Sequence, residues 1–91
     1  MKYVINHVHI RATDPRKSAE WYAEHFNAEI MSEREVMPGT ITVSTKVGGS
    51  ARLNISSQPE GSSPQRASAE LNQLGLEHFG FDVTDLASEL D

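Results

Sequence analysis

The chain has 91 residues, a length that allows one small domain with a modest core. Its 37% hydrophobic and 23% charged residues are typical of a folded globular protein rather than a disordered one. The formal net charge of -5 argues against nucleic acid as a partner, because nucleic-acid phosphates require a basic surface. We expect no membrane association and a cytoplasmic location, because the sequence has neither an apolar run of spanning length nor a signal peptide. The absence of cysteine limits any metal site to nitrogen and oxygen ligands.

The first predicted element is a strand. Residues 3–12 alternate in character, and successive side chains of a strand point to opposite faces. The alternation places His7, His9 and Arg11 on one face and apolar residues such as Val8 on the other. One face of this strand is therefore expected to be buried, while the other carries two imidazoles and a guanidinium.

A helix is predicted next. Asp14 is a favourable N-cap, and Pro15 is preorganised for the first helical turn. The helix is expected to end near Asn27, a residue that tolerates the left-handed conformation of a helix terminus. Its buried stripe follows the i, i+3, i+4, i+7 spacing and consists of Ala19, Tyr22, Ala23 and Phe26.

Three further strands are expected over residues 28–36, 40–47 and 51–57. They are separated by two turn sequences, Pro38-Gly39 and Gly48-Gly49-Ser50. Such short connections favour antiparallel hairpins. The order of elements is therefore strand, helix and three strands.

A linker rich in Ser, Pro, Gly and Gln is predicted over residues 58–74, and a repeat of the opening pattern follows it. In both copies a histidine, His7 or His78, precedes alternating residues and is followed by Thr-Asp at the sixth and seventh positions. The repeat predicts a second strand over residues 76–83 and the start of a second helix. Two imidazoles at matched positions of related strands are how a pseudo-symmetric fold would build a metal site.

The ordered set of these segments resembles the vicinal oxygen chelate superfamily, which includes glyoxalase I, extradiol dioxygenases and bleomycin-binding proteins. The segments that carry the resemblance are Ile5-Asn6-His7-Val8-His9-Ile10, Ala19-Glu20-Trp21-Tyr22 and Gly75-Leu76-Glu77-His78-Phe79-Gly80-Phe81. The resemblance implies an α+β fold built from βαβββ modules. Residues 1–57 would form the first module, residues 58–74 the linker, and residues 75–91 the first strand and helix start of an incomplete second module.

The resemblance also implies a site for a divalent metal ion, namely Fe, Mn, Zn or Ni. By position, His7 and His78 would be the two histidine ligands. Some members add Glu or Gln from the fourth strand, where this chain has Asn54, and a final carboxylate would lie beyond Asp91. Asn54 is then expected either to approach the metal or substrate through its amide oxygen or to make a structural hydrogen bond.

Two residues beside His7 complete the expected site. His9 shares its face and would act as a general base or as a hydrogen-bonded wall residue of the cavity. Arg11 would bind a carboxylate or phosphate of a substrate, or form a salt bridge at the end of the strand.

The function implied by the resemblance is that of a metal-dependent lyase or transferase acting on a small oxygenated molecule. The alternatives are a ring-opening extradiol dioxygenase and a metal-free small-molecule binder of the bleomycin-resistance type, so enzymatic activity stays open. A homodimer is expected, because a second module that stops early would leave the apolar surface of Phe79 and Phe81 poorly covered.

Overall fold

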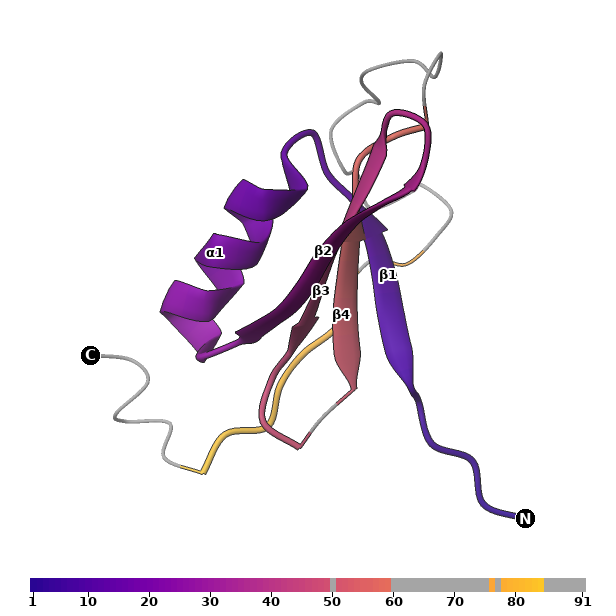
Figure 1. Ribbon diagram of the computed structural model, residues 1–91. Coiled ribbons are helices and arrows are strands. Elements are labelled where there is room, and N and C mark those ends of the chain that lie inside the picture. Colours follow the sequence, from indigo (N-terminus) through magenta and orange to yellow (C-terminus); the bar gives the residue numbers. More distant parts are fainter. Residues whose placement is uncertain (50, 60–75, 77, 85–91) are drawn as a thin grey trace.

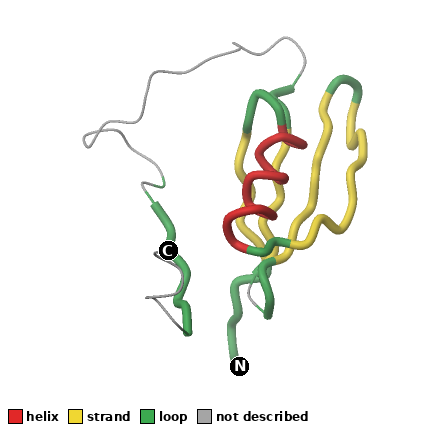
Figure 2. Tube along the Cα trace, turned by 90° about the vertical axis from the view of Figure 1, so that its left-hand side faces the viewer, coloured by secondary structure: helices red, strands yellow, loops and turns green. Residues whose placement is uncertain are grey.

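The computed structural model describes residues 1–49, 51–59, 76 and 78–84. Its elements follow the order β1, α1, β2, β3, β4 and form a four-stranded sheet with the helix on one face (Figures 1 and 2). Their bounds are His7–Arg11 for β1, Pro15–Phe26 for α1, Glu29–Met37 for β2, Thr40–Lys46 for β3 and Arg52–Ser56 for β4. The expected α+β class and the βαβββ order are confirmed, with strand ends within about two residues of the prediction except at β1.

The strands lie in the order β1-β4-β3-β2, so the first strand of the chain lies beside the last. β1 runs parallel to β4, and the hairpins β2–β3 and β3–β4 are antiparallel, as the short turns predicted. The register places Ile10 opposite Ile55 and Ile55 opposite Val43. Within the described residues, β4 is the only sheet neighbour of β1, so β1 forms one edge of the sheet.

Helix α1 begins and ends as its sequence predicts. The Asp14 side chain accepts a hydrogen bond from the Lys17 backbone N–H at 3.1 Å, and Pro15 occupies the first turn. At the other end Asn27 adopts a left-handed conformation with a φ of 56°. These caps satisfy backbone groups that have no partner inside the helix.

Replacing the cap should weaken the helix measurably. Asp14→Ala is expected to lower the free energy of unfolding by about 0.5–2 kcal/mol, because the Lys17 N–H loses its acceptor. Urea denaturation followed by circular dichroism measures this loss. Asp14→Asn is the matched control, since its amide oxygen can still cap, and it should stay close to the parent protein. An equal loss in both variants would contradict the capping role.

The core is small and aliphatic. Its buried cluster lies between α1 and the sheet and consists of Ala19, Val43, Leu53 and Ile55. Val8 and Ile10 pack against this cluster from β1, and Tyr22 contacts its margin. The alternation predicted for the first strand is therefore confirmed, with its apolar residues facing α1 and its histidines facing away.

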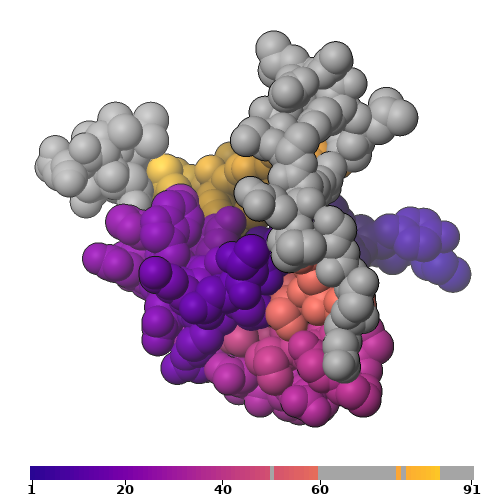
Figure 3. Space-filling view, turned by 90° about the horizontal axis from the view of Figure 1, so that it is seen from above, coloured from indigo at the N-terminus to yellow at the C-terminus, as the bar shows by residue number. Residues whose placement is uncertain are grey.

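Two expected strand regions are not formed in full. β1 begins at His7, and the preceding residues project from the body of the protein, where Tyr3, Val4 and Ile5 are 87%, 89% and 71% exposed (Figure 3). The prediction of a strand over residues 76–83 is wrong for the described part of this segment, because residues 76 and 78–84 have no regular secondary structure. They contact α1 through side chains instead of pairing with the edge of β1, as the packing of Phe81 on Phe26 illustrates.

Most of the predicted linker, and the predicted start of a second helix, lie outside the described residues. Within the described part, the structure has no helix with the length and apolar character needed to cross a lipid bilayer.

Candidate functional site

The face of the sheet opposite α1 carries polar side chains. The strand register places residues of β1, β4, β3 and β2 side by side on this face, at positions that alternate with the core residues. We call this surface the polar face; it comprises His7, His9, Arg11, Glu29, Ser32, Arg34, Thr42, Ser44, Lys46, Arg52, Asn54 and Ser56. Four of the five predicted site residues lie on the polar face, namely His7, His9, Arg11 and Asn54.

A chain of hydrogen bonds crosses the polar face from β1 to β3. The distance from His9 Nε2 to Ser56 Oγ is 2.6 Å, and the distance from Ser56 Oγ to Thr42 Oγ1 is also 2.6 Å. Ser56 is buried at 1% exposure, whereas His9 is exposed. If Ser56 donates to His9, Thr42 can donate to Ser56. In the opposite direction His9 donates to Ser56 and Ser56 donates to Thr42, because a hydroxyl group can both donate and accept. The imidazole tautomer is thus coupled to two hydroxyl groups.

Asn54 makes the structural hydrogen bond that was one of its two expected roles. Its Oδ1 accepts a hydrogen bond from Ser44 Oγ at 2.8 Å, across the β3–β4 pair. In the parallel register it lies opposite His9. The Asn54 side chain is therefore held near the centre of the polar face, next to His9, whose imidazole begins the chain of hydrogen bonds to Ser56 and Thr42.

The polar face carries every Lys and Arg side chain of the four described strands. Arg11, Arg34, Lys46 and Arg52 lie on it, which is half of the eight Lys and Arg residues of the chain. Within the four strands its acidic member is Glu29, opposite Lys46 at one end of the sheet. Arg11 donates to the Ser57 carbonyl at 2.7 Å instead of forming the expected salt bridge at the strand end. An acidic chain thus presents a locally cationic surface.

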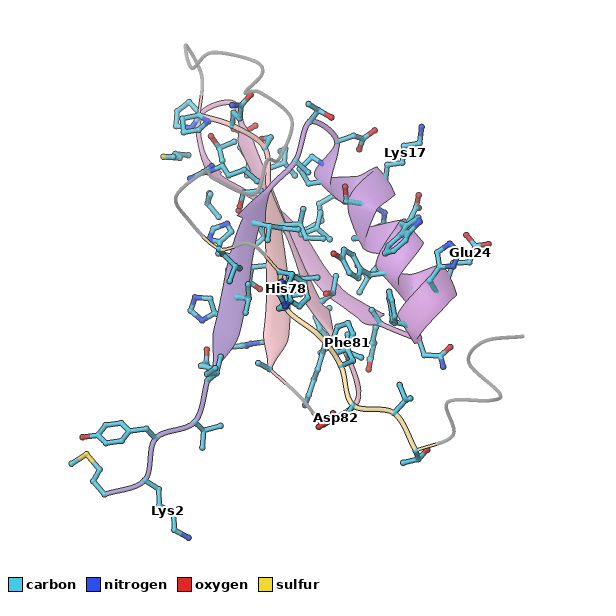
Figure 4. All side chains as sticks on the ribbon, turned by 180° about the vertical axis from the view of Figure 1, so that it is seen from behind. Lys2, Lys17, Glu24, His78, Phe81 and Asp82 are labelled. Atoms are coloured by element: carbon cyan, nitrogen blue, oxygen red, sulfur yellow. The ribbon has the colours of Figure 1, made fainter. Side chains whose placement is uncertain are left out.

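The two histidines predicted to share a metal lie on different sides of the sheet. His7 is exposed on the polar face, and its Nδ1 donates to Asn6 Oδ1 at 3.0 Å. His78 lies on the side of α1, where it lines a cavity together with Ile10, Trp21 and His25. Figure 4 shows His78 and Phe81 over the sheet, between β1 and α1. The structure therefore does not bring His7 and His78 together.

The donor set can be tested against the metal that the resemblance implies. A metal site needs several nitrogen or oxygen ligands that converge on one point. Among the residues that the structure describes, no three His, Asp or Glu side chains are grouped closely enough to hold an ion. His7 and His9 share a face, but Ser56 already engages His9 Nε2. In this arrangement the described residues do not fit a metal centre.

Two features of the molecule were missed in the sequence. Ser56 and Thr42 are absent from the site predicted from the sequence, although their positions alternate with the apolar ones and so indicate a shared polar surface. The cavity beside α1 was also missed. Its signal is the clustering of aromatic residues at positions 21–26 and 79–81, of which Tyr22 and Phe26 were predicted to be buried and Phe79 and Phe81 to be poorly covered.

Comparison with known proteins identifies the family. The family model of the glyoxalase/bleomycin resistance protein/dioxygenase superfamily matches residues 4–91, which is nearly the whole chain. No curated protein and no solved structure matches the chain. The match agrees with the βαβββ order and with the mixed four-stranded sheet. By its sequence and its module, the chain belongs to the glyoxalase/bleomycin resistance protein/dioxygenase superfamily.

Proposed function

We propose that this superfamily member binds a small, oxygen-rich anionic molecule on the polar face. The observation that carries the proposal is the concentration of cations and hydroxyl groups on one side of the sheet in a chain of net charge -5. Arginine binds carboxylate and phosphate oxygens through paired N–H groups, and hydroxyl groups complement the remaining oxygens. Arg11 on β1 and Arg52 on β4 lie diagonally across from each other, on either side of the His9–Asn54 pair.

His9 is the residue best placed to take part in chemistry on such a ligand. It is exposed, so a molecule on the polar face can reach its ring, while its Nε2 is held by Ser56. The Ser56 and Thr42 hydroxyl groups can reverse their hydrogen bonds when the imidazole gains or loses a proton. We propose His9 as a proton-transferring group, supported by this chain, and Arg11 as an anion-binding residue.

Malonate is a suitable probe, because it carries two carboxylates and no aromatic group. Titration into the labelled protein should shift the backbone amide signals of β1 and β4 in two-dimensional NMR spectra. The double variant Arg11→Gln/Arg52→Gln is expected to bind malonate about tenfold more weakly, because each exposed charged contact contributes up to about 1 kcal/mol. Raising the salt concentration should also weaken binding by screening.

Two controls make the malonate experiment specific. Malonamide has nearly the same shape without charge and should bind far more weakly. Arg16→Gln removes a cation from α1, where Arg16 pairs with Glu20 and Glu33, and should leave malonate binding unchanged. Equal binding of malonamide, or an equal loss in the Arg16 variant, would overturn the proposed anion site.

Metal-dependent lyase or transferase chemistry is a second candidate, supported by the superfamily and by two exposed histidines on β1. It requires His78 to move to the polar side of β1, next to His7. In that arrangement a divalent ion would supply Lewis-acid activation of a substrate oxygen. Concerted shifts of the His7 and His78 imidazole signals on adding Zn²⁺ would support it. The extradiol dioxygenase alternative needs the same rearrangement, whereas the metal-free binder does not.

We also propose that two copies associate through the edge of β1. Along this edge, backbone groups on one side of β1 have no strand neighbour among the described residues. The preceding residues Tyr3, Val4 and Ile5 are highly exposed and apolar, which suits burial against a second copy. A continuous sheet formed in this way would join two polar faces and would bring two sets of His7 and His9 onto one surface.

A further inference from the structure

A cavity of about 780 Å³ lies on the helix side of the sheet, between α1 and the described residues 76 and 78–83. It is separate from the polar face, because its strand residue, Ile10, points toward the core. The lining includes the single tryptophan of the chain, all three phenylalanines and one of its two tyrosines. Its volume falls in the range of cavities that hold drug-sized ligands.

The aromatic residues are concentrated here and not in the core. The buried cluster is aliphatic, whereas Trp21 is 49% exposed and Phe79 is 38% exposed at the cavity. Leaving large rings open to water is unfavourable, because each ring would gain free energy from burial. A group of half-exposed rings around one hollow is therefore typical of a surface that a ligand covers.

The rings meet at varied angles around the hollow. Phe26 packs against Phe81 with centroids 5.1 Å apart, and Phe79 meets Phe81 edge to face at 5.9 Å and 89°. On the helix, Trp21 lies 5.7 Å from Phe26. Aromatic rings favour offset-stacked and edge-to-face partners, so this wall offers both faces and edges to a further ring.

Two imidazoles supply the polar groups of the cavity. His25 and His78 both line it, and His25 also lies against Trp21 with ring centroids 4.7 Å apart. A neutral imidazole carries one N–H donor and one acceptor nitrogen. Few polar groups within an apolar wall are what fix the orientation of a bound small molecule.

We propose that this cavity binds a planar aromatic small molecule that carries a hydrogen-bonding oxygen. The rings of Trp21, Phe26, Phe79 and Phe81 would contact its ring system, and His25 would form a hydrogen bond with its oxygen. This site lies on the other side of the sheet from the proposed anion site and does not depend on it. It adds a second binding function to the same small domain.

A pair of neutral probes tests the proposal. 2-Naphthamide is planar and aromatic, whereas decahydro-2-naphthamide has the same skeleton without aromatic rings. The first should shift the Trp21 indole N–H signal, which is the single signal of its kind because the chain has one tryptophan. 2-Naphthamide should bind at least about fivefold more tightly than the saturated compound, since contacts between aromatic rings add binding free energy beyond that of the buried apolar area. Intermolecular NMR contacts should connect it to the Trp21 and Phe81 rings.

Phe79→Leu removes one ring but keeps an apolar side chain, and it should weaken 2-naphthamide binding about fivefold. Tyr3→Leu is the matched control, because Tyr3 is the aromatic residue outside the cavity. The β3 and β4 signals of both variants should match the parent spectrum. Equal binding of the two probes, equal loss in both variants, or contacts away from Trp21 would overturn this site. Because both probes are uncharged, failure here leaves the malonate result unaffected.

Discussion

Replacing Ile55 with alanine is expected to lower the free energy of unfolding by about 2–5 kcal/mol. Ile55 is fully buried at 0% exposure on the central part of the sheet, opposite Ile10 on β1 and Val43 on β3. The change removes apolar atoms and leaves a cavity that neighbouring strands cannot fill. Because a small domain has a total stability of about 5–15 kcal/mol, this single substitution should remove a large share of it.

Urea denaturation followed by circular dichroism is the measurement for Ile55→Ala, with unfolding fitted to two states. Val36→Ala is the control, since it also truncates a branched apolar side chain, but one that is 54% exposed on β2. The control should change the free energy of unfolding by no more than about 0.5 kcal/mol. Similar losses in both variants would contradict the position of the core between α1 and the sheet.

Ser56→Ala should have the second-largest effect, a loss of about 1–3 kcal/mol in the free energy of unfolding. The Ser56 hydroxyl is 1% exposed and lies 2.6 Å from both His9 Nε2 and Thr42 Oγ1. Without it, the partly buried Thr42 hydroxyl loses its side-chain partner, and a buried polar group left unpaired is unfavourable. The imidazole of His9 loses its anchor at the same time.

A double-mutant cycle with Thr42→Val separates this effect from a simple loss of packing. If the two hydroxyl groups are bonded, the double variant Ser56→Ala/Thr42→Val should be destabilised by less than the sum of the single variants, since no orphaned hydroxyl remains. The His9 side-chain signals should also change in Ser56→Ala. Additive losses together with unchanged His9 signals would contradict the hydrogen-bond chain.

Local features of the fold were predictable from the sequence. The Asp14 cap, the helix end at Asn27 and the alternation of β1 depend on residues close together in the chain, where backbone chemistry decides the outcome. The turn sequences also predicted the order of strand, helix and three strands, and the resemblance singled out Asn54 as a site position. Alternation predicted the face of β1 that carries His7, His9 and Arg11, but the hydroxyl groups of Thr42 and Ser56 beside it were not predicted.

Features that depend on distant contacts were less predictable. The repeat around His78 predicted a strand, but a strand forms only with a neighbour to pair with, and residues 76 and 78–84 pack their rings against α1 instead. Matched sequence positions of His7 and His78 therefore did not produce matched positions in space. The Ser56 link between His9 and Thr42 depends on the register of three strands, which no local pattern specifies.

The parallel pairing of β1 with β4 also bears on how the protein is made. His7 pairs with Arg52, so β1 has no neighbouring strand until β4 (Arg52–Ser56) has also been synthesised. The β2–β3 and β3–β4 hairpins join sequence-adjacent segments and can assemble sooner, since loop closure is slower for distant segments. During translation the N-terminal strand is thus exposed to solvent and to chaperones, and its docking would be the step that completes the sheet.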